Sequence, residues 1–265
     1  MTKRNEIRIA CLAVIVAAFA AWSCDGGGTA SSSSGPSSES TASSNAYSVV
    51  ANISSWPPGA EGTQALEANL MRKNYYLVLD GSGSMEEDSC GSNESKISVA
   101  RKATVEWSKT VPEDANLGLL IFSREGIVQK VPLGKGKENR DAFVKAVSGA
   151  RADGGTPLYT AMKLGYRALE EQGRKQLGYG EYHLVLVTDG EANLGEDPRS
   201  MVDYIVSSSP VMITTIGFCI GNKHSLNQPG RVIYHEANNP TALREGLKDV
   251  LAESPVFDAT VFENQ

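Results

Sequence analysis

Residues 75–85 read Tyr-Tyr-Leu-Val-Leu-Asp-Gly-Ser-Gly-Ser-Met, an apolar run that ends in one carboxylate and continues into two serines set between glycines. Aromatic and branched residues bounded by Gly and Ser are typical of a buried strand that enters a tight loop. Glycine permits close approach of other groups, so Asp80, Ser82 and Ser84 can face a common point. One carboxylate and two hydroxyls are hard oxygen ligands, which suit Mg²⁺ or Mn²⁺ better than Zn²⁺.

Two later segments carry matching groups. Gly154-Gly155-Thr156-Pro157 offers a third hydroxyl, and residues 185–190 (Val-Leu-Val-Thr-Asp-Gly) form a second apolar run that ends in a carboxylate. The set resembles the metal-ion-dependent adhesion site of the von Willebrand factor type A (VWA) family, whose pattern is Asp-x-Ser-x-Ser, then a Thr, then an Asp after a later strand. All five positions are filled in order, by Asp80, Ser82, Ser84, Thr156 and Asp189.

Strand-like and helix-like segments alternate along residues 70–253, which we take as the VWA domain. This alternation predicts an α/β fold in which helices cover both faces of a mostly parallel sheet. We expect a Rossmann-like, doubly wound sheet with one antiparallel edge strand at 127–133. Thr156, directly before Pro157, fits a helix N-cap. The resemblance further implies that the strands ending in Asp80 and Asp189 are neighbours where the strand order reverses, which is where open sheets bind ligands.

The N-terminal region resembles that of a bacterial lipoprotein. Residues 1–23 have the features of a signal peptide: basic residues precede an apolar run that is shorter than the roughly 20 residues a membrane span needs. Cys24 stands where such proteins are lipidated; ordinary cleavage that releases a soluble protein is the alternative. Residues 24–48 are Ser-rich and predict a disordered tether, 49–69 a connecting segment, and 254–265 a C-terminal tail.

Composition limits the classes of partner. The chain has 265 residues, of which 41% are apolar and 21% charged, enough for one domain with a full core plus appendages. Its net charge of −6 argues against a nucleic-acid partner, because phosphate binding requires a basic surface.

The resemblance implies a function in binding. In the family, the serine hydroxyls bind the metal directly and a position remains for a carboxylate of a partner protein. We therefore expect a Mg²⁺ site, with Mn²⁺ or Ca²⁺ as alternatives, that grips an acidic side chain of another protein at the cell envelope, without a small-molecule substrate. Arg124, Tyr159, Asn193 and His224 are candidate partner contacts around the same rim.

Two other function classes stay open. Asp80 could act as a phosphoryl-accepting nucleophile with Asp189 holding Mg²⁺. We expect no enzyme, because this chemistry usually needs a nearby Lys or a second acid two residues on, where this chain has Ser82. The third class is a structural subunit of an envelope complex in which the metal site is unused.

The four cysteines predict one disulfide. Cys11 leaves with the signal peptide and Cys24 receives the lipid, so Cys90 and Cys219 remain in an exported, oxidising setting. We expect them to pair and to fix the loop that carries Ser82 and Ser84; two unpaired thiols are the alternative.

Overall fold

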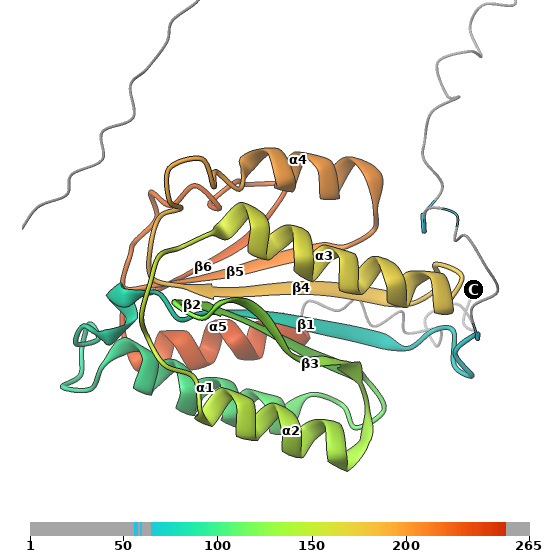
Figure 1. The fold of residues 1–265 in the computed structure, drawn as a ribbon, viewed down its shortest axis with the longest axis horizontal. Coiled ribbons are helices and arrows are strands. Elements are labelled where there is room, and N and C mark those ends of the chain that lie inside the picture. Colours follow the sequence, from blue (N-terminus) through green and yellow to red (C-terminus); the bar gives the residue numbers. More distant parts are fainter. Residues whose placement is uncertain (1–55, 58, 60–64, 253–265) are drawn as a thin grey trace, which may run out of the picture. The chain divides into compact units, whose positions relative to one another are not determined.

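The computed structural model describes residues 56–57, 59 and 65–252, and a six-stranded sheet runs through this part of the chain (Figure 1). In chain order the elements are β1 (Lys73–Asp80), the 3₁₀ turn η1 (Gly83–Glu86), α1 (Lys96–Thr110), β2 (Asn116–Ser123), β3 (Gly126–Gly134), α2 (Gly136–Ser148), α3 (Leu158–Lys175), β4 (Glu181–Thr188), α4 (Arg199–Ser208), β5 (Met212–Phe218), β6 (Ile233–Ala237) and α5 (Pro240–Ala252).

Several sequence predictions fall outside the described residues. These are the signal peptide (1–23), the lipidation site Cys24 with the tether (24–48), the C-terminal tail (254–265) and most of the connecting segment (49–69). In the described part, no helix combines the length and the apolar content needed to cross a bilayer.

The strand order is β3-β2-β1-β4-β5-β6, and every neighbouring pair is parallel except β2 and β3. The order reverses between β1 and β4, and Leu79 pairs with Val187 there. Asp80 and Asp189 therefore follow adjacent strands at one edge of the sheet. The predicted fold class, with its antiparallel edge strand, is confirmed.

Each central strand is buried on both faces. On β1, the alternating residues Tyr75, Leu77 and Leu79 pack in one core cluster, while Tyr76 and Val78 pack in another. Side chains alternate across a sheet, so a strand covered on both sides needs apolar residues at every position. This is why residues 75–79 form an unbroken apolar run.

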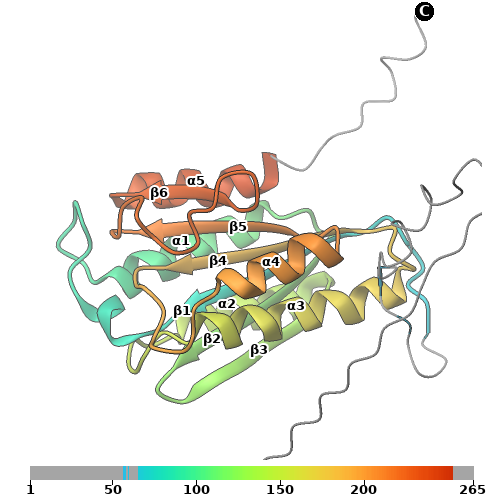
Figure 2. The ribbon, with the colours of Figure 1, turned by 90° about the horizontal axis from the view of Figure 1, so that it is seen from above.

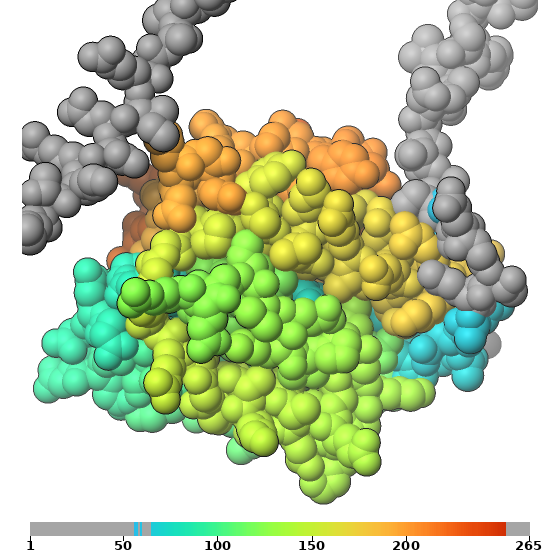
Figure 3. Space-filling view, in the orientation of Figure 1, coloured from blue at the N-terminus to red at the C-terminus, as the bar shows by residue number. Residues whose placement is uncertain are grey.

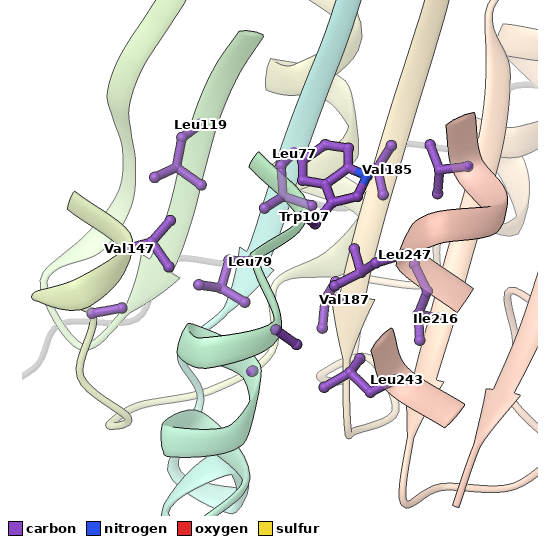
Figure 4. Packing of buried hydrophobic residues seen from close by; sticks show 14 of the residues in the cluster. Leu77, Leu79, Trp107, Leu119, Val147, Val185, Val187, Ile216, Leu243 and Leu247 are labelled. Carbon is purple, nitrogen blue, oxygen red and sulfur yellow. The ribbon is translucent and has the colours of Figure 1, made fainter. Parts of the chain in front are cut away.

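Helices α1, α2 and α5 cover one face of the sheet (Figure 1). Beneath them, Trp107 of α1 lies beside Leu77, and Leu243 and Leu247 of α5 approach Val187 and its neighbours (Figure 4). Each such side chain stabilises the fold by about 1.5–3 kcal/mol when fully buried.

Helices α3 and α4 cover the opposite face, as the view from above shows (Figure 2). Helix α3 lies very close to the strands: a Cβ at Gly165 would stand 2.8 Å from Leu184 Cδ1. The space-filling view shows α3 and α4 as the yellow and orange layer of the molecule (Figure 3). Both layers leave the carboxyl ends of the parallel strands to the loops.

A buried amide network ties the amino ends of the strands together. Asn74 on β1 donates to Gln176 Oε1 (2.8 Å) and accepts from Asn116 Nδ2 (2.9 Å). Gln176 Nε2 in turn donates to the carbonyls of Leu70 (3.0 Å) and Arg72 (2.9 Å). Both Asn74 and Gln176 are fully buried, so each bond satisfies a group that would otherwise be unpaired.

One disulfide, between Cys90 and Cys219, is present with an S–S distance of 2.10 Å. Cys90 lies in the loop between η1 and α1, and Cys219 directly follows β5. The bond ties the loop after the two serines to the carboxyl edge of the sheet, and it is the pairing that the cysteine count predicts.

Replacing Gln176 with Ala should lower the free energy of unfolding by about 2–3 kcal/mol, because it removes one acceptor from Asn74 and the donor to the carbonyls of Leu70 and Arg72 inside a buried network. Urea denaturation measures this change. Gln129→Ala, at an exposed position on β3, is the matched control and should change stability by about 0.5 kcal/mol or less. Equal losses in the two variants would contradict a stabilising role for the network.

Replacing Cys90 and Cys219 together with Ser should lower the free energy of unfolding by about 2–4 kcal/mol. The reason is that a bond across a sequence separation of 129 residues restricts the unfolded chain. Wild-type protein should lose similar stability when a reductant is added, and the double variant should not respond. A wild type that unfolds at the same urea concentration with and without reductant would show that the bond contributes nothing.

Candidate metal centre

Asp80 ends β1 as a fully buried carboxylate. Its Oδ1 accepts the backbone N–H of Ser82 (2.6 Å), and its Oδ2 accepts the hydroxyl of Thr188 (2.6 Å). Burial raises the pKa of Asp80 to about 6; these hydrogen bonds lower the pKa, and the charge of Asp189 raises it further. A carboxylate that is costly to ionise in the folded protein would gain from a nearby cation.

The two serines stand side by side just beyond it. Their Oγ atoms are 3.1 Å apart, and Ser84 Oγ donates to Asp189 Oδ1 (2.8 Å). The turn depends on Gly81, since a Cβ there would lie 2.7 Å from the carbonyl oxygen of Phe122 and 2.8 Å from that of Arg151. Any side chain at position 81 would collide with backbone, so glycine is required for this approach.

Thr156 reaches the same place from the loop before α3. A Cβ built on Gly190 would lie 3.5 Å from both Thr156 Oγ1 and Ser84 Oγ. The missing side chain of Gly190 thus leaves a small space bordered by two hydroxyls, with Asp189 as the preceding residue. The structure brings all five sequence-predicted residues to one edge of the sheet.

The predicted capping role of Thr156 is wrong. Helix α3 begins at Leu158, Pro157 is the cap residue, and no side chain caps it in the expected way. Instead, Glu196 accepts the N–H of Thr160 at Oε2 (2.8 Å) and the N–H of Tyr159 at its carbonyl (3.1 Å). Because a distant loop satisfies the first turn, the hydroxyl of Thr156 is not used in capping.

Backbone hydrogen bonds lock the loops to one another. Gly83 N–H donates to the carbonyl of Gly154 (3.0 Å), and Asp153 N–H donates to that of Gly81 (2.8 Å). On the other side, Thr156 N–H donates to Asn193 Oδ1 (3.0 Å). Relative positions of the hydroxyls are therefore set by backbone geometry rather than by the side chains alone.

Two of the proposed rim contacts support the loops of the site through hydrogen bonds. Asn193 holds Thr156, as above. His224 is buried, and its Nδ1 accepts the N–H of Leu226 (2.9 Å), so its Nε2 is the donor to the carbonyl of Gly190 (2.9 Å). His224 is therefore unsuited to partner contact, whereas Asn193 remains exposed. Arg124 is exposed, and its side chain pairs with Asp153.

Lys96 is a site residue that the sequence pattern did not single out. It is the first residue of α1, and its Nζ lies 2.9 Å from Asp189 Oδ2 and 2.8 Å from Glu87 Oε2. Burial alone would lower the pKa of Lys96, but its bonds to Glu87 and Asp189 outweigh burial and raise it. A Lys at the expected helix start, soon after the serine pair, was the available signal.

The donor set fits a hard divalent cation. Three hydroxyls and two carboxylates are oxygen ligands of the type that Mg²⁺, Mn²⁺ or Ca²⁺ takes. Among the described residues, no group of three or more His, Cys, Asp or Glu side chains could hold a metal, so a site built from such ligands alone is absent there. Ser82, Ser84 and Thr156 would supply neutral ligands, and Asp80 and Asp189 the charge.

The family model of the von Willebrand factor type A domain matches residues 74–246. Inter alpha-trypsin inhibitor heavy chain 4 of Mus musculus is 26% identical over 208 residues, which are 73% of this chain and 21% of that protein. The uncharacterized protein YwmD of Bacillus subtilis (strain 168) is 26% identical over 160 residues, which are 55% of this chain and 67% of YwmD.

Among solved structures, the pilus adhesin SpaC from Lactobacillus rhamnosus GG has a similar fold. The TM-score is 0.56 at 16% identity, and the match covers 71% of this chain and 31% of the adhesin. This chain thus spans less than a third of the adhesin and about a fifth of the mouse protein. The family match spans well over half of the residues and includes β1 through most of α5, so the chain belongs to the von Willebrand factor type A domain family.

Proposed function

We propose that this protein is a metal-dependent protein-binding module whose complete adhesion-type site holds Mg²⁺ between Asp80, Ser82, Ser84, Thr156 and Asp189. The observation that carries the proposal is the meeting of two buried carboxylates with three hydroxyls, delivered by three separate loops to the carboxyl edge of the sheet. Mn²⁺ and Ca²⁺ are alternatives with the same ligand chemistry.

The partner group that suits this site is a carboxylate. Serine and threonine hydroxyls add no charge, and Asp80 is already engaged by Ser82 and Thr188. A divalent cation held mainly by neutral ligands keeps affinity for an anion, so an Asp or Glu of a partner protein completes the shell. The three hydroxyls and two carboxylates of this chain would hold the ion, and the ion would supply the positive charge that attracts the carboxylate.

Binding is better supported than catalysis. Asp80 would be the nucleophile of a phosphoryl-transfer enzyme, but its side chain is fully buried and both of its oxygens accept hydrogen bonds. A nucleophile must reach its substrate, and the side chain of Asp80 has no exposed surface. We therefore place Asp80 as a support of the metal shell.

We propose display at the bacterial cell envelope. The supports are the signal-like residues 1–23, Cys24 as the lipidation site that anchors the protein to a membrane, and the Ser-rich tether 24–48. A chain of about 25 such residues spans roughly 25–30 Å root-mean-square. The similarity to a pilus adhesin adds support, since that protein acts in attachment by its name. The domain at 70–253 would then stand off the membrane.

Trp56, upstream of β1, is packed on the domain. Trp56 packs against Tyr166 and Tyr182, with ring centroids 5.8 and 5.5 Å apart. Tyr182 lies at the amino end of β4, whereas Asp189 follows its carboxyl end. Trp56 therefore lies at the end of the domain opposite the metal site.

Wild-type protein should be stabilised by Mg²⁺ and Mn²⁺ in a thermal-shift titration, by about 2.7 kcal/mol once the ion reaches 100 times its dissociation constant. Asp80→Asn should lose this response because it removes one of two site charges at nearly constant volume. Asp141→Asn, on the exposed side of α2, is the control and should respond as the wild type does. A wild type without any shift in either ion would refute the metal site.

Capture of a partner from envelope extract should depend on the metal. Protein loaded with Mg²⁺ should retain a partner that chelator releases, and Asp80→Asn should retain none, because the contact runs through the ion. Asp141→Asn again serves as the control. Retention that survives chelator and Asp80→Asn would instead support the structural-subunit function, in which the metal site is unused.

A further inference from the structure

Lys96 is the one cationic side chain, among the residues that the structure describes, in an ion pair with either site carboxylate. It contacts Asp189 Oδ2 at 2.9 Å, on the oxygen opposite the one that accepts Ser84 Oγ. The Asp189 side chain is fully buried and that of Lys96 is 10% exposed. Because water is nearly excluded, the charges act on each other more strongly than a surface pair would.

The position of Lys96 is imposed by the backbone. Its own N–H donates to the carbonyl of Glu87 (2.9 Å), and Ser89 N–H donates to that of Glu94 (2.8 Å), so residues 87–96 form a closed loop. The disulfide at Cys90 fixes this loop to the end of β5.

A cation at the start of a helix is opposed by the helix dipole. At Lys96 this cost is offset by two carboxylates, those of Glu87 and Asp189. A lysine at this position does not stabilise α1 by itself. We therefore look for its role in its contact with Asp189.

We propose that Lys96 sets the charge of the metal centre and thereby selects carboxylate ligands. The buried charged groups are the carboxylates of Asp80 and Asp189 and the ammonium of Lys96, and they sum to one net negative charge. The carboxylate of Glu87 is left out of this sum because it is 69% exposed and screened by water. A bound divalent cation then gives one net positive charge, which a single carboxylate of the partner neutralises. Lys96 thus acts through Asp189 as a positioning residue: it weakens binding of the cation and strengthens binding of the acidic ligand. This inference rests on the proposed function.

The proposal predicts opposite changes in two affinities. Lys96→Met removes the charge and keeps most of the length of the side chain. It should tighten Mn²⁺ binding about tenfold and weaken acetate binding to the Mn²⁺-loaded protein by a similar factor, as expected for one unit charge close to a partly buried site. A purely structural role would give a different pattern, since a misplaced Asp189 weakens both.

The experiment measures Mn²⁺ affinity by isothermal titration calorimetry and acetate affinity by water-proton relaxation of the Mn²⁺-loaded protein. Lys96→Arg keeps the charge, so its affinities for Mn²⁺ and for acetate should both be close to those of the wild type. Lys102→Met, on the same helix but 60% exposed and paired with Glu94, is the matched control and should change neither. Glu87→Gln, at an exposed side chain, removes the negative charge that pairs with Lys96. The ammonium of Lys96 then repels the cation more strongly, and Mn²⁺ binding should weaken several-fold.

Each outcome decides the inference. Tighter Mn²⁺ and weaker acetate in Lys96→Met support it. If Lys96→Met changes neither affinity, or weakens both, the inference about Lys96 is overturned. The proposed metal site still stands in that case, provided that the wild type binds Mn²⁺. If Lys96→Met does not fold, the sign of the change in Glu87→Gln decides, and tighter or unchanged Mn²⁺ binding in that variant overturns the inference. A wild type that binds no Mn²⁺ overturns the proposed function and the inference together.

Discussion

Two carboxylates are held out of water at the ends of adjacent strands, and the rest of the site compensates that buried charge. Asp80 is 0% exposed and Asp189 is 6% exposed. An unpaired buried carboxylate would cost several kcal/mol, so each has dedicated partners. Asp80 receives an N–H and a hydroxyl, whereas Asp189 receives a hydroxyl and the ammonium of Lys96. The groups around the carboxylates are therefore required by electrostatics even before a metal is considered.

The sheet provides this placement. β1 and β4 are hydrogen-bonded neighbours at the reversal of strand order, so helices on both faces leave their carboxyl ends uncovered. The same apolar residues that fill the two cores fix the strand register, since a shift by one position would exchange the faces. Register in turn sets Asp80 opposite Thr188, whose hydroxyl it accepts. The packing of the core therefore also determines the geometry of the site.

The sequence was informative where chemistry is local. Asp80, Ser82 and Ser84 lie within five residues, and the strand before Asp189 has the same apolar pattern, so both halves of the carboxylate pair were predictable. Lys96, Glu196 and His224 were not assigned their roles, because each acts across loops whose approach only the fold determines. The capping rule failed at Thr156 for the same reason: Glu196, forty residues later, satisfies the first turn of α3.

The disulfide between Cys90 and Cys219 helps to hold Lys96 beside Asp189, so the charge arrangement of the site depends on this bond staying oxidised. Cys90 lies inside the closed loop that begins at Glu87 and ends at Lys96, whose side chains form an ion pair. Lys96 also pairs with Asp189. Fixing the loop to the end of β5 limits how far the ammonium can move from the carboxylate. Because disulfides form and persist in oxidising compartments, an oxidising environment would also hold this charge arrangement in place.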